Sequence, residues 1–433
     1  MSGCVQSSSL DIPLHVDFRQ WTGCRQVASL GTNSGSAAIP FQGWLHFKEA
    51  FTPEIVYQAI SSSSGTISTC IDPFGGSGTT ALTCQFLGVQ PTTIEVNPYL
   101  ADLIEAKLAS YDPDALVRDL GAVLRLASRI DPSERFARLP LTFAEPGVGG
   151  RWIFGRDVAK RILSIQLAVE NLSNAAHRTL FKVLLGGVLI ELSNAVVNGK
   201  GRRYRRGWDK RRRTPGEVDL AFMDAATAAI GEIGRFGKRA SADYTLVRGD
   251  SREAINGLGP FDLAIFSPPY PNSFDYTDVY NIELWMLGYL QASEQNRALR
   301  ESTLTSHVQI HRTFAAAPAG SARLDSALQA LRGKADELWN PHIPAMLGAY
   351  FAEMLGVLES LRSTLNPGGS IWAIVGDSRY AGVLFNTAEI IAELASERDL
   401  NVERLETLRE MRASAQQGGQ AQLAESLLVL RAA

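Results

Sequence analysis

Four consecutive residues near the middle of the chain are suited to binding an amine. Ser267, Pro268, Pro269 and Tyr270 directly follow the apolar run 263–266. Proline has no amide hydrogen, so the two prolines end strand pairing and leave their carbonyls facing whatever lies beyond the strand. A hydroxyl, a carbonyl and an aromatic ring offer two acceptors and a stacking face. We therefore predict that this segment binds a planar group with an exocyclic NH2.

A second segment, far upstream, joins a predicted strand to a predicted helix through a glycine-rich loop. It consists of Asp72, Pro73, Phe74, Gly75, Gly76, Ser77, Gly78, Thr79 and Thr80. Its glycines let the backbone approach a ligand, and the first amides of the helix are free to donate. A phosphate-binding loop would need lysine after Gly78, and the dinucleotide fingerprint has a different glycine spacing.

The remaining ligand for this loop is an adenosyl group without phosphates. Such a ligand needs an acidic residue at the end of the next strand to hold the ribose hydroxyls, and Glu95 stands there. A glycine-rich turn that binds nothing is the alternative, and the amine-binding segment makes it less attractive.

The elements that must position these residues alternate along the chain. Apolar runs and glycine or proline boundaries predict strands at 66–71, 92–96, 244–247, 261–266 and 370–375, and helices at 79–87, 98–109 and 345–365. Another helix begins at Pro53, with Thr52 as its N-cap. Two short strands, 401–408 and 425–430, predict a closing hairpin. We expect a doubly wound, Rossmann-like α/β fold with a C-terminal β-hairpin.

The alternation is interrupted between the second and third strands. Residues 111–242 read as helical, without strand alternation, and form a predicted insertion. Residues 41–110 and 243–433 would then make up one domain, and residues 1–40, rich in Ser, Gly and Thr, a flexible arm.

Composition narrows the class of protein further. The formal net charge of -3 excludes a globally basic nucleic-acid binder but allows a local basic surface. Four cysteines without paired spacing suggest a reduced, cytoplasmic protein, and neither a signal peptide nor a membrane span is expected.

Together, the two segments resemble those of the DNA amino methyltransferases, which use S-adenosylmethionine to methylate exocyclic nitrogens. The glycine loop looks like their cofactor motif, and Ser267 to Tyr270 like their catalytic motif. Segment 374–378 resembles the late strand that helps shape the base pocket. The resemblance implies a class I methyltransferase fold. It also implies that the cofactor is bound by the glycine loop together with Phe51, Thr52, Glu95, Asn97, Asp250, Ser251 and Phe266.

The chemistry of this family would be methyl transfer to the NH2 of a base flipped out of the duplex. Ser267 and the Pro268 carbonyl would accept the amino hydrogens while Tyr270 stacks on the base. Carbon-5 methylation of cytosine would need a Pro-Cys nucleophile, which is absent. Serine as the first catalytic residue resembles the cytosine-N4 subclass. Adenine-N6 methylation, RNA guanine-N2 methylation and a non-catalytic cofactor- or nucleic-acid-binding module are the alternatives.

A basic tract inside the predicted insertion is a candidate DNA contact. It contains Lys200, Arg202, Arg203, Arg205, Arg206, Arg211, Arg212 and Arg213. Phosphate contact is one interpretation; a solvated loop or pairing with acidic helices is the other. His307 and His311 share helical spacing but lack a zinc-site context, so we expect no metal. The resemblance also implies cognate restriction or defence proteins as partners.

Overall fold

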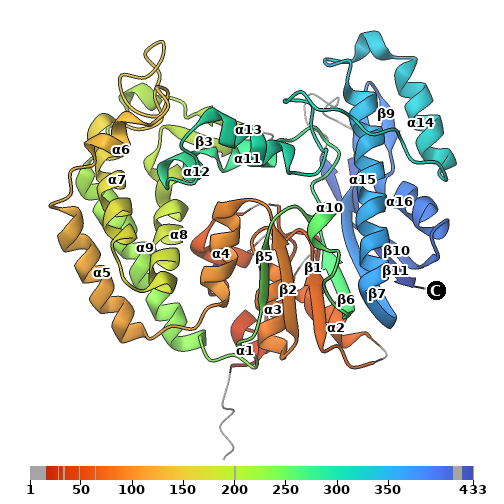
Figure 1. The fold of residues 1–433 in the computed structure, drawn as a ribbon, viewed down its shortest axis with the longest axis horizontal. Helices are drawn as coiled ribbons and strands as arrows, with labels where there is room; N and C mark the ends of the chain where they lie inside the picture. The colour runs from red at the N-terminus through yellow and green to blue at the C-terminus, as the bar shows by residue number, and fades with distance from the viewer. Residues whose placement is uncertain are drawn as a thin grey trace, which may run out of the picture.

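The computed structural model describes residues 16–27, 29–32, 35–47, 49–63, 65–198, 201–412 and 422–432. At its centre is a seven-stranded sheet in the order β10-β11-β7-β6-β1-β2-β5 (Figure 1). The strands are β1 (Thr69–Asp72), β2 (Gln90–Glu95), β5 (Thr245–Arg248), β6 (Phe261–Phe266), β7 (Leu365–Gly376), β10 (Leu400–Arg412) and β11 (Gln422–Ala432). Neighbours from β5 to β7 are parallel, whereas β11 runs antiparallel to both β7 and β10.

Helices cover both faces of this sheet. They are α2 (Pro53–Ser61), α3 (Thr79–Leu87), α4 (Pro98–Leu108), α10 (Ser251–Ala254), α15 (Ile343–Thr364) and α16 (Thr387–Ser396). Successive strand residues point to opposite faces. Accordingly, Ile71 and Ala264 pack in one core with α15 and α16, whereas their neighbours Cys70 and Leu263 pack in another with α2. The doubly wound sheet with a C-terminal hairpin is confirmed.

The observed ends of helices and strands agree best with the predicted ends where a glycine or proline marks the boundary. Helix α3 and strand β6 have the predicted bounds, and α2 begins at Pro53. The hairpin strands are longer than predicted, 13 and 11 residues, because their pairing continues through charged positions that a sequence pattern does not mark as strand. Residues 413–421, between these strands, lie outside the described part of the chain.

The insertion is mainly helical, as predicted, but it also contains a β-hairpin. Its helices are α5 (Pro113–Ala127), α6 (Ser133–Ala137), α7 (Arg156–Glu170), α8 (Ala175–Leu192), η3 (Trp208–Lys210) and α9 (Pro215–Phe236). Strands β3 (Ala195–Asn198) and β4 (Gly201–Tyr204) pair antiparallel, so Arg202 and Arg203 of the basic tract lie on a strand. Helix α8 packs closely on α4, where a Cβ at Gly186 would lie 2.5 Å from the Tyr99 hydroxyl. The insertion therefore shares a core with the sheet domain.

The prediction of a flexible arm over residues 1–40 is wrong for the part that the structure describes. Residues from Val16 onward include α1 (Phe18–Thr22) and η1 (Ser36–Ala38), followed by η2 (Gln42–Trp44). The Trp21 side chain is 1% exposed and stacks on Phe86 of α3 at 4.4 Å. Buried aromatic rings fix this segment, although its Ser- and Gly-rich composition suggested otherwise.

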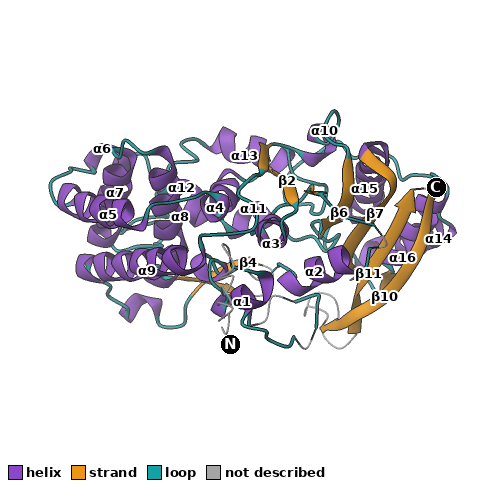
Figure 2. Ribbon diagram, turned by 90° about the horizontal axis from the view of Figure 1, so that it is seen from below, coloured by secondary structure: helices purple, strands orange, loops and turns teal. Residues whose placement is uncertain are grey.

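The connection from β6 to α15 forms a wall beyond the sheet edge. It contains α11 (Tyr276–Val279), α12 (Asn281–Met286), α13 (Ser293–Glu301), α14 (Ala322–Arg332) and η4 (Ala335–Glu337). Strands β8 (Ser378–Tyr380) and β9 (Val383–Phe385) form a small separate hairpin. Figure 2 shows the elongated molecule, with the insertion helices at one end and the β10–β11 hairpin at the other. Among the described residues, no helix has the length and apolarity that a membrane span requires.

Candidate active site

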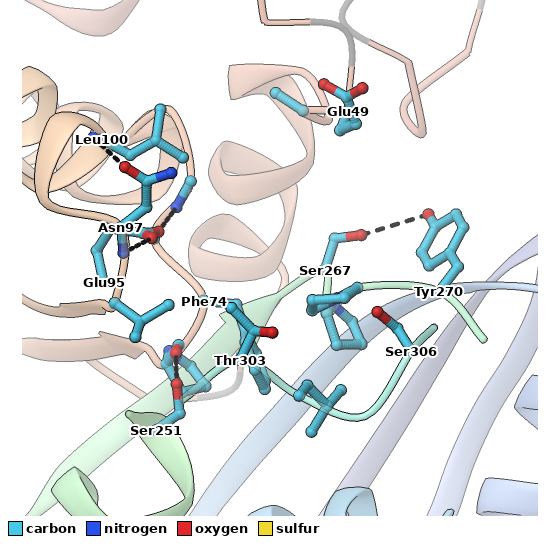
Figure 3. Close-up of a pocket in the computed structure, with 18 of the residues that line it drawn as sticks. Glu49, Phe74, Glu95, Asn97, Leu100, Ser251, Ser267, Tyr270, Thr303 and Ser306 are labelled. Atoms are coloured by element: carbon cyan, nitrogen blue, oxygen red, sulfur yellow. Dashed lines mark hydrogen bonds between the residues drawn. The ribbon is translucent and has the colours of Figure 1, made fainter. Parts of the chain in front are cut away.

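Three parallel strands bring the predicted site residues to one edge of the sheet. Ile71 of β1 lies opposite Ala264 of β6, and Asp72 lies opposite Thr93 of β2. The glycine loop, Glu95 and Ser267 therefore emerge side by side. They line one cavity of about 320 Å³, large enough for a small ligand. Figure 3 shows Glu95 and Asn97 on one side, Ser267 and Tyr270 on the other, and Phe74 between them.

Most of the predicted site residues line this cavity. All four predicted catalytic residues do, together with Phe51, Asp72, Pro73, Phe74, Gly75, Gly76, Ser77, Thr79, Glu95, Asn97, Asp250 and Ser251. Four predicted cofactor residues are not part of the lining: Thr52, Gly78, Thr80 and Phe266. Phe266 is buried behind Phe74, with ring centroids 5.6 Å apart, and Thr52 and Thr80 are buried at the starts of α2 and α3.

Gly78 has a structural role instead. It precedes α3 with φ at 76°, a left-handed conformation that glycine adopts without strain. At Gly75, a Cβ would lie 2.3 Å from the Thr93 side chain, so only glycine lets the loop pass this close to β2. These glycines place the loop amides along the cavity.

Glu95 and Asp72 form the acidic end of the cavity. Glu95 accepts hydrogen bonds from the amides of Gly76 at 2.7 Å and Asn97 at 2.8 Å. Burial raises the pKa of Glu95 to about 7, although these amides oppose the shift. Burial likewise raises the pKa of Asp72 to about 6. A ligand that donates hydrogen bonds or carries positive charge would favour the ionised forms of both acids.

Three further predicted residues bind other protein groups as well as lining the cavity. The Asn97 side chain caps α4 by accepting from the amide of Tyr99 at 3.0 Å. The Asp250 carboxylate is paired with Arg252, whose Nε lies 2.9 Å away. The Ser251 hydroxyl donates to the carbonyl of Pro73, which ties the end of β5 to the glycine loop.

At the opposite end, segment 267–270, predicted to be catalytic, is held by a hydrogen bond to the C-terminal hairpin. The Ser267 hydroxyl donates to the Tyr270 hydroxyl at 3.3 Å, and Tyr270 donates to Glu425 of β11 at 2.8 Å. Arg409 of β10 pairs with Glu425 at 2.5 Å. Gly376 of β7 packs against the Tyr270 ring, where a Cβ would lie 2.5 Å from the ring carbons.

Sequence reasoning missed several residues of the lining. Glu425 and Arg409 enter from the C-terminal hairpin, Glu49 from the stretch before α2, and Tyr280 from the end of α11. The Phe47 ring, which also lines the cavity, stacks with that of Tyr280, with the ring centroids 5.8 Å apart. These residues come from four separate stretches of chain, so no local spacing could have revealed them as one set.

His307 also lines the cavity, on a segment without helix, so the predicted helical pairing with His311 is wrong. Its side chain is 1% exposed, and neither ring nitrogen has a hydrogen-bond partner among the described residues. Burial, with Arg312 and Arg300 nearby, lowers the pKa of His307 to about 3, so the ring is neutral.

The predicted DNA-contacting arginines divide into two groups. Arg205 and Arg211 donate to the carbonyls of Ile190 and Glu191 at 2.9 and 2.7 Å, which caps the C-terminus of α8. Arg202 and Arg213 are largely buried and pair with Asp278 and Glu191.

The second group faces solvent. Arg203 and Arg206 are exposed, as is Arg212, which pairs with Glu145 at 3.8 Å. Lys200 lies outside the described residues. Because β4 packs on α11, and Thr277 of α11 lines the cavity, the β3–β4 hairpin lies close to the cavity.

Comparisons with known proteins identify relatives along most of the chain. Type II methyltransferase M.BsoBI of Geobacillus stearothermophilus is 24% identical over 462 residues, covering 93% of this chain and 86% of the relative. Type II methyltransferase M.AvaI of Nostoc sp. is 25% identical over 423 residues, covering 88% and 83%. No protein-family model matches.

Among solved structures, TehB from Haemophilus influenzae has a TM-score of 0.30 at 8% identity, covering 88% of this chain and 62% of its own. The rRNA methyltransferase aviRa from Streptomyces viridochromogenes has a TM-score of 0.25 at 12% identity, covering 88% and 85%.

The sheet described above is that of a class I methyltransferase. The chain therefore has this fold and is similar over most of its length to Type II methyltransferases, which supports a methyltransferase enzyme.

Proposed function

We propose that this protein transfers a methyl group from S-adenosylmethionine to the N4 amino group of a cytosine flipped out of DNA. The observation that carries the proposal is one cavity lined by acids and glycines at one end and by Ser267, Pro268 and Tyr270 at the other. This chain matches Type II methyltransferases over more than four fifths of their length, and this similarity supports DNA as the substrate.

The acidic end fits the cofactor. Glu95 would accept hydrogen bonds from the ribose hydroxyls, and the carboxylate of Asp72 would favour a cationic ligand. Loop amides and the aromatic ring of Phe74 complete this end. When bound, S-adenosylmethionine supplies a methyl group on a positively charged sulfur.

The other end fits an amino group on a planar base. Ser267 and the carbonyl of Pro268 would accept the two amino hydrogens, which turns the nitrogen lone pair toward the methyl group. Tyr270 would stack on the ring, and holding the partners in line lowers the barrier further. His307, neutral and without a hydrogen-bond partner among the described residues, has one donor and one acceptor for the edge of the base.

DNA would approach beside the cavity wall, where Arg203 and Arg206 face solvent. Their charge would bind phosphates without reading sequence. A cognate restriction or defence protein is the further partner that we propose.

Mass spectrometry of nucleosides tests the proposal directly. DNA and RNA are each incubated with the protein and S-adenosylmethionine carrying a labelled methyl group. N4-methylcytosine in DNA is the expected product. N6-methyladenine would overturn the choice of base, methylated RNA alone would overturn the polymer, and cofactor binding without any product would overturn catalysis.

A further inference from the structure

The buried ion pair on the C-terminal hairpin reaches directly into the catalytic segment. Glu425 is 2% exposed, and its Oε1 accepts from the Tyr270 hydroxyl at 2.8 Å and from Arg409 Nη2 at 3.1 Å. Its Oε2 accepts from Arg409 Nε at 2.5 Å. A carboxylate held by a guanidinium in this way offers acceptors only.

That constraint fixes the direction of the two hydrogen bonds that connect Glu425 with Ser267 through Tyr270. Because Glu425 can only accept, the Tyr270 hydroxyl must donate its single proton to it. The Tyr270 oxygen can then only accept, and it receives the Ser267 proton at 3.3 Å (Figure 3). Ser267 has no second proton, so its oxygen, which lines the cavity, can only accept from a ligand there.

We propose that Glu425 and Arg409 are positioning residues that keep Ser267 an acceptor for an amino hydrogen of the target base. This inference rests on the proposed function. It adds that the hairpin, more than 130 residues downstream of Ser267, sets the proton order in the catalytic segment.

Exchanging the carboxylate for an amide should reverse that order. In Glu425→Gln, Arg409 still requires an acceptor, so the amide oxygen turns to Arg409 and the NH2 to Tyr270. Tyr270 then accepts from the amide and donates to Ser267, which must point its own proton at the substrate. We expect the single-turnover rate of methyl transfer to fall about tenfold or more, with the Kd for S-adenosylmethionine unchanged. Glu410→Gln, exposed on the same hairpin, is the matched control.

A double-mutant cycle with Tyr270→Phe separates positioning from general damage. Removing the tyrosine hydroxyl breaks the hydrogen-bonded link from Glu425 to Ser267, so Glu425→Gln should cause no further loss of rate in that background. Thermal unfolding of each variant identifies any that fail to fold, and Tyr270→Phe alone should then still lower the rate.

Three outcomes would overturn the inference. One is a Glu425→Gln rate equal to that of wild type, and another is the same fold loss with and without the Tyr270 hydroxyl. Both leave the proposed function standing, provided that the wild-type protein methylates DNA. A wild-type protein that transfers no methyl group to any base would remove both.

Discussion

At the scale of single residues, the two ends of the cavity offer a ligand different groups. Asp72 and Glu95 are acids whose pKa values are raised by burial, whereas Ser267, Pro268 and Tyr270 contribute neutral groups at the other end. A cationic methyl donor and a neutral amine would each find the chemistry they need. The two ends can therefore be tested separately.

Ser267→Ala should lower the rate of methyl transfer by tenfold or more, because an amino hydrogen would lose its acceptor, at a cost of roughly 1–3 kcal/mol. Its Kd for S-adenosylmethionine should stay near the wild-type value, since Ser267 lies on the other side of Phe74 from Glu95 (Figure 3). Single-turnover kinetics and calorimetry measure the two quantities. A large loss of cofactor binding would contradict the assigned role.

Cofactor binding should depend on pH through Glu95. Ribose hydroxyls donate best to the carboxylate, and the pKa of Glu95 is about 7 in the ligand-free protein. Affinity should therefore rise as pH increases through 7, by about tenfold between pH 6 and 8. Titration calorimetry across this range measures it. Glu95→Gln should bind more weakly and keep only the smaller dependence near pH 6 that Asp72 contributes; a wild-type slope in this variant would remove Glu95 from the site.

At the scale of elements, the sequence predicted those helices and strands whose ends are marked by local residue patterns. Apolar runs that end in glycine or proline identified β1, β6 and α3, and parallel strands bring their carboxyl ends together. Glu425 and His307 could not be predicted as site residues, because their roles arise from pairing and packing between distant segments. Charge density also failed to distinguish Arg205, which caps α8, from Arg203, which faces solvent.

Strand β7 offers a test of how an element shapes the base-binding end. A Cβ at Gly376 would lie 2.5 Å from the Tyr270 ring, so Gly376→Ala must displace that ring or the strand. Overpacking of this kind costs about 1–3 kcal/mol. We expect at least tenfold slower methyl transfer with unchanged cofactor affinity.

The control for this variant is Gly356→Ala. Gly356 is exposed on α15. Apart from the nearby backbone of its own helix, no atom of the described residues lies within 4 Å of the position that a Cβ would take, and alanine should slightly stabilise the helix. Equal activity of both variants would show that Tyr270 does not depend on this contact.

At the scale of the whole molecule, the insertion is packed onto the sheet domain and extends the surface around the cavity. Its α8 packs on α4, and Glu232 of α9 accepts from the Trp44 side chain at 2.8 Å. Its β-hairpin contacts α11, which forms part of the cavity wall. DNA bound by exposed residues of this hairpin would therefore lie next to the base-binding end.

Neutralising two different pairs of arginines in the basic tract should affect two different properties, DNA binding for one pair and stability for the other. Arg203→Gln with Arg206→Gln removes exposed charge, so the slope of log K against log salt for DNA binding should decrease by up to about 2, with stability unchanged. Arg205→Gln with Arg211→Gln removes the caps of α8, so the free energy of unfolding should fall by roughly 1–3 kcal/mol while the salt slope changes less. Binding titrations at several salt concentrations and denaturant unfolding measure both. If the Arg203→Gln, Arg206→Gln variant leaves the salt slope unchanged, these two arginines do not contact phosphate. DNA must then approach the cavity over another surface.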